Sequence, residues 1–380
     1  MSNDSANSDG VGCGTPRHPL HGLRVVSMAE QYPGPFCTAI LSDLGADVIQ
    51  VERPGAGDPA RLFAPLFEVL NRGKRSVALD AAQEADHAAL LELIDSADVF
   101  LEGFRPGKVA KFGLDWETLS ARNPRLIYCS ISGYGQNGPY RDRPAHDLSY
   151  QGVGGALDDR LKGDVTGAPP GILLGDTTSA LYATIGILAA LRGREQSGEG
   201  TYLDVAMSDT VVAAQTPFVA LAQDPDPPAP PQAEPAFSMF ECADGTWLTL
   251  SIAHEDSYWA RLMHSLGHPE HASLRRPART ARYAELHGII ATAIRRRPRA
   301  EWAAIFDESD QMWGPANLLK DVPQDPHVVA RGLLKRLTRA DGTEQWVGVQ
   351  PIKFSAYENR PLTRAPRLGE HQDAKFGTLK

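Results

Sequence analysis

The chain has 380 residues, of which 42% are hydrophobic and 22% are charged, and its formal net charge is −9. This length and composition are typical of a globular protein with a sizeable core and more than one domain. The acidic balance argues against nonspecific binding to nucleic acid, although it leaves room for a local basic pocket that takes an anionic ligand.

The four cysteines are scattered, and the chain contains neither a CxxC pair nor a Cys/His ligand spacing. We therefore expect reduced thiols, no metal site and a cytoplasmic location. Residues 1–20 are polar and lack a hydrophobic signal region, so we expect a disordered leader there. No uninterrupted apolar run reaches membrane-spanning length, and we expect no membrane partner.

The first half of the chain alternates short β-branched runs with helical periodicity. Strands are expected at 23–28, 47–54, 76–80, 98–104 and 125–135, with helices at 36–46 and 84–97. Strand–helix–strand units of this kind favour an open, Rossmann-like α/β domain with a parallel sheet, whose ligands bind beyond the carboxyl ends of the strands. No GxGxxG follows the first strand, which argues against a nicotinamide or flavin cofactor.

A long apolar helix is expected over 171–195, with a single acidic residue, Asp176, at its mouth. Leu181, Ile185, Leu188 and Leu191 recur at helical spacing with small residues between them, so we expect the helix to be packed on most sides. Asp176 precedes Thr177 and two more hydroxyl residues, a pattern typical of a helix N-cap, which is the commoner role. The alternative is a carboxylate held ionised by the helix N-terminus and able to attack an electrophile.

The chain changes character at residues 223–237, where prolines are dense enough to form an extended linker. After it, a hairpin with its turn at 243–245 and helices near 257–267, 281–297 and 300–309 predict a smaller α+β domain. The expected organisation is a large domain over 21–222, a small domain over 238–335, and a return to the large domain over 336–380.

Several motifs taken together resemble family III CoA transferases, the CaiB/BaiF group, which includes the α-methylacyl-CoA racemases. They are VERPGAGDPAR, NRGKRSVALD, ADVFLEGFRPG, GDTTSALYATIGILAAL, MWGPAN and LGEHQ, within a resemblance that runs from Gly22 to about Gln372. The resemblance implies a discontinuous large domain, an interlocked homodimer, and acyl-CoA and a carboxylic acid as substrates, with no permanently bound cofactor.

In the family pattern the catalytic carboxylate matches Asp176. The implied chemistry is attack of this carboxylate on an acyl-CoA thioester to give an anhydride, followed by return of the CoA thiolate to give an aspartyl-CoA thioester. An acceptor acid then reverses the sequence. Because an anhydride hydrolyses readily, the site has to exclude water.

Coenzyme A carries phosphates, so it needs cations despite the acidic total. The resemblance places CoA contacts at Arg53, Lys74, Phe104 and Lys111, and the same loop as Lys74 offers Arg75. Solvated side chains for the cations, and core packing for Phe104, are the plain alternatives.

A rival chemistry depends on His146 in the run RPAHDLSY, which is similar to the catalytic base of the racemases. With Asp176 as its partner, it would move a proton at the carbon next to a thioester. The glutamate that racemases carry in the small domain is matched by His254, with Glu255 one residue later.

The chain also departs from the formyl-CoA:oxalate transferases, whose glycine-rich loop is missing. Tyr32 stands where those enzymes have a glutamine, with Gln31 and Glu30 just before it, and we expect all three near the active site. A third reading is a catalytically silent CoA-binding protein, against which the intact Asp176 argues.

Overall fold

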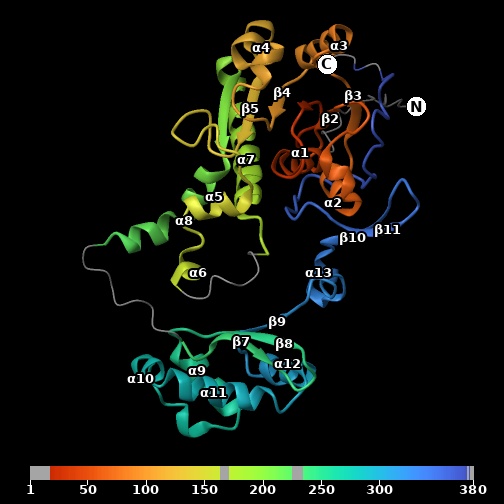
Figure 1. Cartoon of the computed structure of the whole chain (residues 1–380). Coiled ribbons are helices and arrows are strands. Elements are labelled where there is room, and N and C mark those ends of the chain that lie inside the picture. The colour runs from red at the N-terminus through yellow and green to blue at the C-terminus, as the bar shows by residue number, and fades with distance from the viewer. Residues whose placement is uncertain (1–17, 163–170, 225–233, 375, 377–380) are drawn as a thin grey trace, which may run out of the picture. The chain divides into compact units, whose positions relative to one another are not determined.

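The structure is a computed structural model that describes residues 18–162, 171–224, 234–374 and 376. The chain divides into two compact units (Figure 1). One combines Met1–Ala220 with Gly332–Lys380, and the other is Leu221–Arg331. Most of the expected leader and most of the proline-rich linker lie outside the described residues.

The first unit is built on six parallel strands in the order β3-β2-β1-β4-β5-β6. The strands are β1 (Arg24–Ser27), β2 (Asp47–Glu52), β3 (Arg75–Ala78), β4 (Val99–Glu102), β5 (Ile127–Ser132) and β6 (Thr201–Ala206). The expected open α/β architecture is therefore confirmed, although β6 was not foreseen. The strand order reverses direction between β1 and β4, which is where ligands bind in sheets of this kind.

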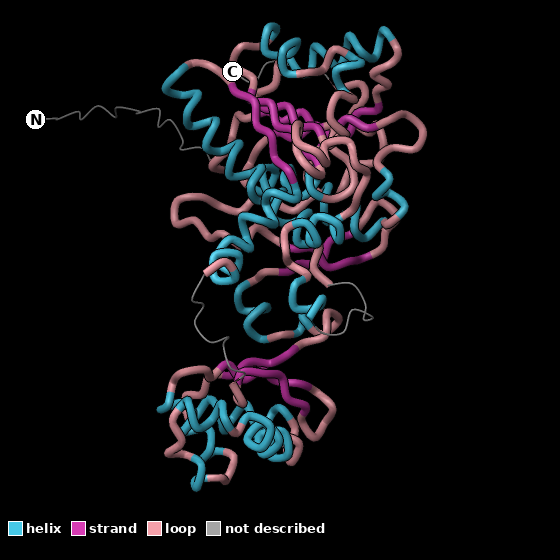
Figure 2. Tube along the Cα trace, turned by 60° about the vertical axis from the view of Figure 1, so that its left-hand side comes forward, coloured by secondary structure: helices cyan, strands magenta, loops and turns pink. Residues whose placement is uncertain are grey.

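Helices cover both faces of the sheet because alternate residues of each strand point to opposite sides. Val26, Ile49 and Phe100 share one buried cluster with residues of α3 (Glu84–Asp95) and α4 (Trp116–Arg122). Val25 and Leu101 belong to a second cluster with α1 (Pro33–Asp43) and α7 (Leu174–Ser197). In Figure 2 the magenta strands accordingly lie among cyan helices.

The long helix α7 is packed on one side, and the expectation of packing on most sides is wrong. Ala180, Ala183 and Ile187 are buried against α1 and the sheet, whereas Leu181 and Ile185 are exposed. Leu188 and Leu191 are partly buried and pack against the same cluster. By length and composition α7 would pass for a membrane-spanning helix, which is weak evidence because core helices of soluble proteins pass the same test.

Other helices of the first unit connect the strands or follow them. They are α2 (Ala64–Asn71), α5 (Asp147–Val153), α6 (Asp158–Lys162) and α8 (Met207–Ala222), together with the 3₁₀ turns η1 (Pro59–Leu62) and η2 (Val109–Phe112). The returning segment forms the hairpin of β10 (Leu334–Thr338) and β11 (Glu344–Gly348) and then runs without strands through residue 374. Arg360 from this segment donates to the carbonyl oxygens of Ser42 and Ala46, which ties it to the end of α1.

The second unit has a three-stranded antiparallel sheet of β7 (Phe237–Glu241), β8 (Trp247–Ser251) and β9 (Trp313–Ala316). The expected hairpin turn holds Gly245, whose φ of +74° is left-handed backbone that favours glycine. Helices α9 (Asp256–Ser265), α10 (Arg276–Ala281), α11 (Tyr283–Ile294) and α12 (Arg299–Glu308) cover this sheet, followed by η4 (Val322–Gln324) and α13 (Pro326–Arg331), with η3 (Pro269–His271) between α9 and α10. Trp259, Leu286 and Phe306 are among its fully buried core residues.

Candidate active site

A cavity of about 410 Å³ lies at the carboxyl edge of the parallel sheet in the first unit. It is formed where the chain leaves β1, β4, β5 and β6, so it includes the switch point between β1 and β4. The first turn of α7 brings Asp176 to its wall. The charged and polar lining residues are Glu30, Gln31, Tyr32, Arg105, Ser132, Arg141, Arg143, His146, Tyr150 and Asp176.

Asp176 lies inside the first turn of α7 and is not its N-cap, which corrects the expectation from the local sequence. The N-cap is Leu173, and it makes no side-chain hydrogen bond. The first N–H groups of α7 are instead capped by a residue of α5. The Asp147 Oδ1 atom accepts from the Gly175 N–H at 2.7 Å and from the Asp176 N–H at 3.1 Å. A carboxylate 29 residues earlier in the chain therefore performs the capping.

This arrangement changes the charge state of Asp176. Burial, and after it the negative charge of Asp147, raise the pKa of Asp176 from its ordinary 3.8 to about 7. The expectation that the helix N-terminus holds this carboxylate ionised is thus wrong in direction, because burial and the negative charge of Asp147 both favour the protonated form. Near neutral pH the group exchanges between a protonated form and a nucleophilic one.

Asp147 is itself fixed by its surroundings. It is the first residue of α5 and is 6% exposed, and the Gln151 side-chain amide donates to its Oδ2 atom. A Cβ added at Gly175 would come within 3.2 Å of Asp147 Oδ1, so the absence of a side chain there permits the close approach. His146, directly before Asp147, is exposed and also lines the cavity.

Tyr150 holds the segment that carries His146. Its hydroxyl donates to the Ala145 carbonyl oxygen at 2.9 Å, and its ring meets the edge of Tyr134 with centroids 5.2 Å apart. A Cβ at Gly133 would lie 2.7 Å from the Tyr150 hydroxyl oxygen, so glycine is required at the end of β5. Burial raises the pKa of Tyr150 to about 12, so its hydroxyl keeps its proton.

The segment after β1 supplies the opposite wall. Glu30, Gln31 and Tyr32 all line the cavity, as expected from the sequence. Glu30 pairs with Arg53 at 3.2 Å, and the Arg53 side chain is 64% exposed. Burial raises the pKa of Glu30 even though the charge of Arg53 opposes the shift.

The segment after β4 supplies Phe104 and Arg105. The Phe104 N–H donates to the Glu102 Oε2 atom at 2.7 Å, and burial raises the pKa of Glu102 to about 7. The Lys108 ammonium lies 4.4 Å from the centroid of the Phe104 ring, in cation–π contact. Glu102 thereby fixes the start of a basic segment at the mouth of the cavity.

Three arginines line the wall, of which Arg141 and Arg143 were not assigned to the site from the sequence. The Arg141 guanidinium already has partners within the protein, since it donates to the Gln136 carbonyl oxygen and pairs with Asp142 at 2.8 Å. Arg143 packs on the Tyr140 ring at 3.8 Å, and within the described ranges neither Arg143 nor Arg105 has an ion-pair partner. Arg105 follows the end of β4, at the edge of a parallel sheet where ligands bind.

Three of the expected coenzyme A contacts are placed away from this cavity. Lys74 is 4% exposed, and its ammonium donates to the Pro35 carbonyl oxygen at 3.0 Å and to the Asn71 side chain at 2.9 Å. Arg75 begins β3, at the amino edge of the sheet, and pairs with Asp47 at 3.1 Å. Lys111 lies in η2 and does not line the cavity. Their binding of coenzyme A stays a prediction.

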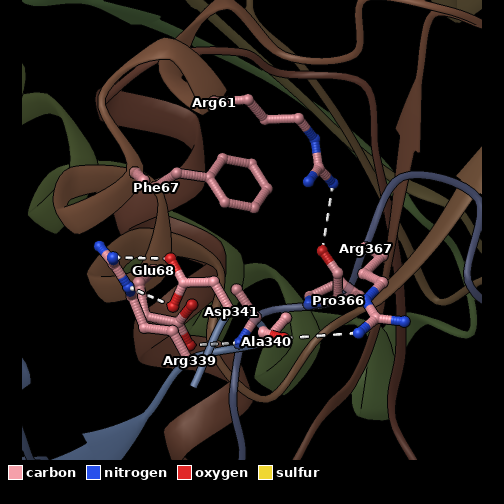
Figure 3. Close-up of a pocket in the computed structure, with 10 residues that line it drawn as sticks. Arg61, Phe67, Glu68, Arg339, Ala340, Asp341, Pro366 and Arg367 are labelled. Carbon is pink, nitrogen blue, oxygen red and sulfur yellow. Dashed lines mark hydrogen bonds and ion pairs between the residues drawn. The ribbon is translucent and has the colours of Figure 1, made fainter. Parts of the chain in front are cut away.

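A smaller cavity of about 170 Å³ lies between α2 and the turn of the β10–β11 hairpin (Figure 3). Two of the arginines that line it form ion pairs with carboxylates. Arg61 pairs with Glu52 at 2.7 Å, and Arg339 pairs with Asp341 at 2.8 Å. Glu68 accepts from the Ala365 N–H at 2.6 Å. These contacts tie the returning segment to α2. Across the described parts of the chain, no group of three or more His, Cys, Asp or Glu side chains is placed to hold a metal ion.

Comparisons with known proteins show the family of this chain. The family model for CoA-transferase family III matches residues 20–372. The chain is 35% identical to the succinate–glutarate CoA-transferase of Agrobacterium fabrum over 95% of this chain and 96% of that one. It is 34% identical to the succinyl-CoA:mesaconate CoA-transferase of Haloarcula hispanica over 93% of this chain and 94% of that one.

A crystal structure of a CaiB/BaiF family protein from Brucella suis superimposes with a TM-score of 0.83 at 32% identity, over 94% of this chain and 98% of that one. The fold and the family expected from the sequence are both confirmed. The chain belongs to CoA-transferase family III.

Proposed function

We propose that this enzyme transfers coenzyme A between two dicarboxylic acids, with Asp176 as the nucleophile. The observation that carries the proposal is the position of the Asp176 carboxylate. It lies in the wall of the carboxyl-edge cavity, with its pKa raised to about 7. Relatives named for succinate, glutarate and mesaconate support dicarboxylic acids as the substrates.

The reaction begins when the ionised Asp176 attacks the carbonyl carbon of an acyl-CoA thioester. The carbon–sulfur bond breaks, CoA leaves as its thiolate, and an acyl-aspartyl anhydride remains. The thiolate then attacks the aspartyl carbonyl, which releases the donor acid and leaves an aspartyl-CoA thioester. An acceptor carboxylate reverses both steps and restores Asp176, so no proton is consumed overall.

The arginines and lysines near the site fall into two groups, one beside the cavity and one that lines it. Arg53 and Lys108 lie beside Glu30 and Phe104 at the mouth, with Lys111 further along the same segment, where they suit the phosphates of coenzyme A. Arg105 and Arg143 line the cavity itself. Their guanidinium groups suit the second carboxylate of a dicarboxylic acid whose first carboxylate reacts at Asp176.

Trapping with hydroxylamine tests the nucleophile. The enzyme is incubated with succinyl-CoA and hydroxylamine, and peptide mass spectrometry follows residue 176. We expect a hydroxamate at Asp176 with release of CoA, and no adduct in Asp176→Asn. Absence of an adduct in the native enzyme would contradict the proposal.

A second candidate function is racemisation at the carbon next to the thioester, and the observation that favours it is His146 in the same cavity wall as Asp176. The same incubation in deuterium oxide, with a 2-methylacyl-CoA, separates the two. Exchange of the α-proton that is lost in His146→Gln, without an adduct at Asp176, would establish racemisation instead.

We also propose that the protein is a homodimer of cytoplasmic location. Exposed apolar side chains on α7 and α8, namely Leu181, Tyr182, Ile185, Val212 and Phe218, support a self-association surface. Free thiols at Cys37, Cys129 and Cys242 support a reducing compartment. Sedimentation equilibrium of the native protein and of Ile185→Lys tests the homodimer, and a native monomer would refute it.

A further inference from the structure

We propose that Asp58 is a positioning residue, which holds the backbone of Gln31 in a left-handed conformation so that Glu30 and Tyr32 face the cavity. Asp58 lies outside the cavity and would touch no substrate. The inference rests on the proposed function, because it assigns the support of that same site.

The backbone at Gln31 is strained. Its φ is +67°, and within the described residues only Asp310 shares a positive φ without being glycine. A residue with a Cβ atom is disfavoured there, and glutamine lacks the short side chain that lets Asn or Asp bond locally in this region. Such a conformation persists where the surroundings over-determine it, and this occurs preferentially at functional sites.

The surroundings at Gln31 are the two carboxylate oxygens of Asp58. The Gln31 N–H donates to Oδ1 at 3.0 Å and to Oδ2 at 3.1 Å. Asp58 is 1% exposed, and its Oδ1 atom also accepts from the Ala60 N–H at 2.8 Å, as the N-cap of η1. Its one carboxylate therefore joins the segment after β1 to the turn after β2.

Asp58 is held in turn by a buried ion pair. Its N–H donates to Glu52 Oε2 at 3.0 Å. The Glu52 carboxylate in turn accepts from Arg61 Nε and Nη2, both at 2.7 Å, and from the Ser76 hydroxyl at 2.7 Å. Arg61 reaches the Pro366 carbonyl oxygen at 3.3 Å, which Figure 3 marks with a dashed line. The anchor therefore extends from β2 and β3 to the returning segment.

The rest of the segment has no room to compensate. The Gln50 side-chain amide donates to the Ala29 carbonyl oxygen at 2.7 Å, and a Cβ at Gly34 would lie 2.1 Å from the Ala29 Cβ atom. With Ala29 and the start of α1 both fixed, a change of φ at Gln31 has to turn Glu30 and Tyr32. Loss of the Asp58 bond should therefore lower kcat while leaving Lys108 and Lys111, on the segment after β4, in place.

The test compares glycine with alanine at position 31 in two backgrounds. Gln31→Gly and Gln31→Ala both remove the side chain, but only glycine accepts a positive φ freely. With Asp58 intact, we expect the two to have kcat values within about threefold of each other. With Asp58→Asn added, the glycine variant should keep about tenfold more kcat than the alanine variant, with KM for acyl-CoA little changed.

An equal glycine-to-alanine ratio in both backgrounds would overturn the proposal and leave Asp58 with only its role at η1. If Asp58→Asn does not fold, Gln31→Pro replaces it. Proline removes the N–H and forbids the positive φ without touching η1. We expect a loss of kcat of about 100-fold together with a lowered thermal midpoint, and native kcat in Gln31→Pro would refute the proposal.

Hydroxylamine trapping is run on each variant to keep the two proposals apart. If Asp176 of the native enzyme forms no adduct, the proposed function fails. If the native enzyme forms the adduct and every variant forms it at the same rate, only the positioning role of Asp58 fails.

Discussion

The pH dependence of the transferase reaction follows from the position of Asp176. With its pKa raised to about 7, this carboxylate is about 90% ionised at pH 8, half ionised at pH 7 and about 10% ionised at pH 6. Only the ionised form can attack a thioester, so kcat/KM for acyl-CoA should fall about tenfold from pH 8 to pH 6. An aspartate with an ordinary pKa would be fully ionised throughout, and the profile would be flat.

The matched variant is Asp147→Asn, which removes the negative charge but keeps an oxygen to accept from the Gly175 and Asp176 N–H groups. Loss of a like charge favours the ionised form, so the pKa of Asp176 should fall and the acidic limb should move to lower pH. Because burial is the larger cause and persists, we expect the pKa to stay above the ordinary value.

The assay is the initial rate of CoA transfer at constant ionic strength, with the rate of hydroxylamine trapping as a second measure. His146→Gln serves as the control, because His146 lines the same cavity as Asp176. A flat native profile would refute the reasoning. An acidic limb that is unchanged in Asp147→Asn and absent in His146→Gln would also refute the reasoning.

Three further outcomes are expected. Because folding raises the pKa of Asp176 from 3.8 to about 7, its ionisation costs stability, which is lost as pH rises from the unfolded value through 7. Asp176→Asn should gain up to about 4 kcal/mol in urea unfolding at pH 8 and about 2 kcal/mol or less at pH 5. Arg143→Gln should raise KM about tenfold or more for a dicarboxylic acceptor and much less for a monocarboxylic one, whereas Arg141→Gln, whose guanidinium is already paired, should leave that ratio unchanged. Gly133→Ala places a Cβ 2.7 Å from the Tyr150 hydroxyl and should cost about 1–3 kcal/mol of stability, and an unchanged thermal midpoint would contradict that packing.

The sequence by itself determined the class of fold and singled out Asp176, the nucleophile that we propose. Buried parallel strands appear as short continuous apolar runs, so five of the six strands were predicted near their places, while β6 was not foreseen. Asp176 and His146 could be singled out because each stands in a motif. Local pattern also located the long helix, though it placed Asp176 at the cap.

Only the tertiary structure decided what surrounds those residues. The capping of α7 by Asp147 joins segments 28 and 29 residues apart, and no local pattern reports which carboxylate will reach a helix end. Burial, and after it the negative charge of the same Asp147, reverse the direction expected for the pKa of Asp176. Lys74 likewise stands in a motif that predicts a phosphate ligand, but its side chain is buried and its ammonium donates to a carbonyl oxygen of α1. Burial and charge depend on which elements meet in space, and that is set by strand order and helix packing.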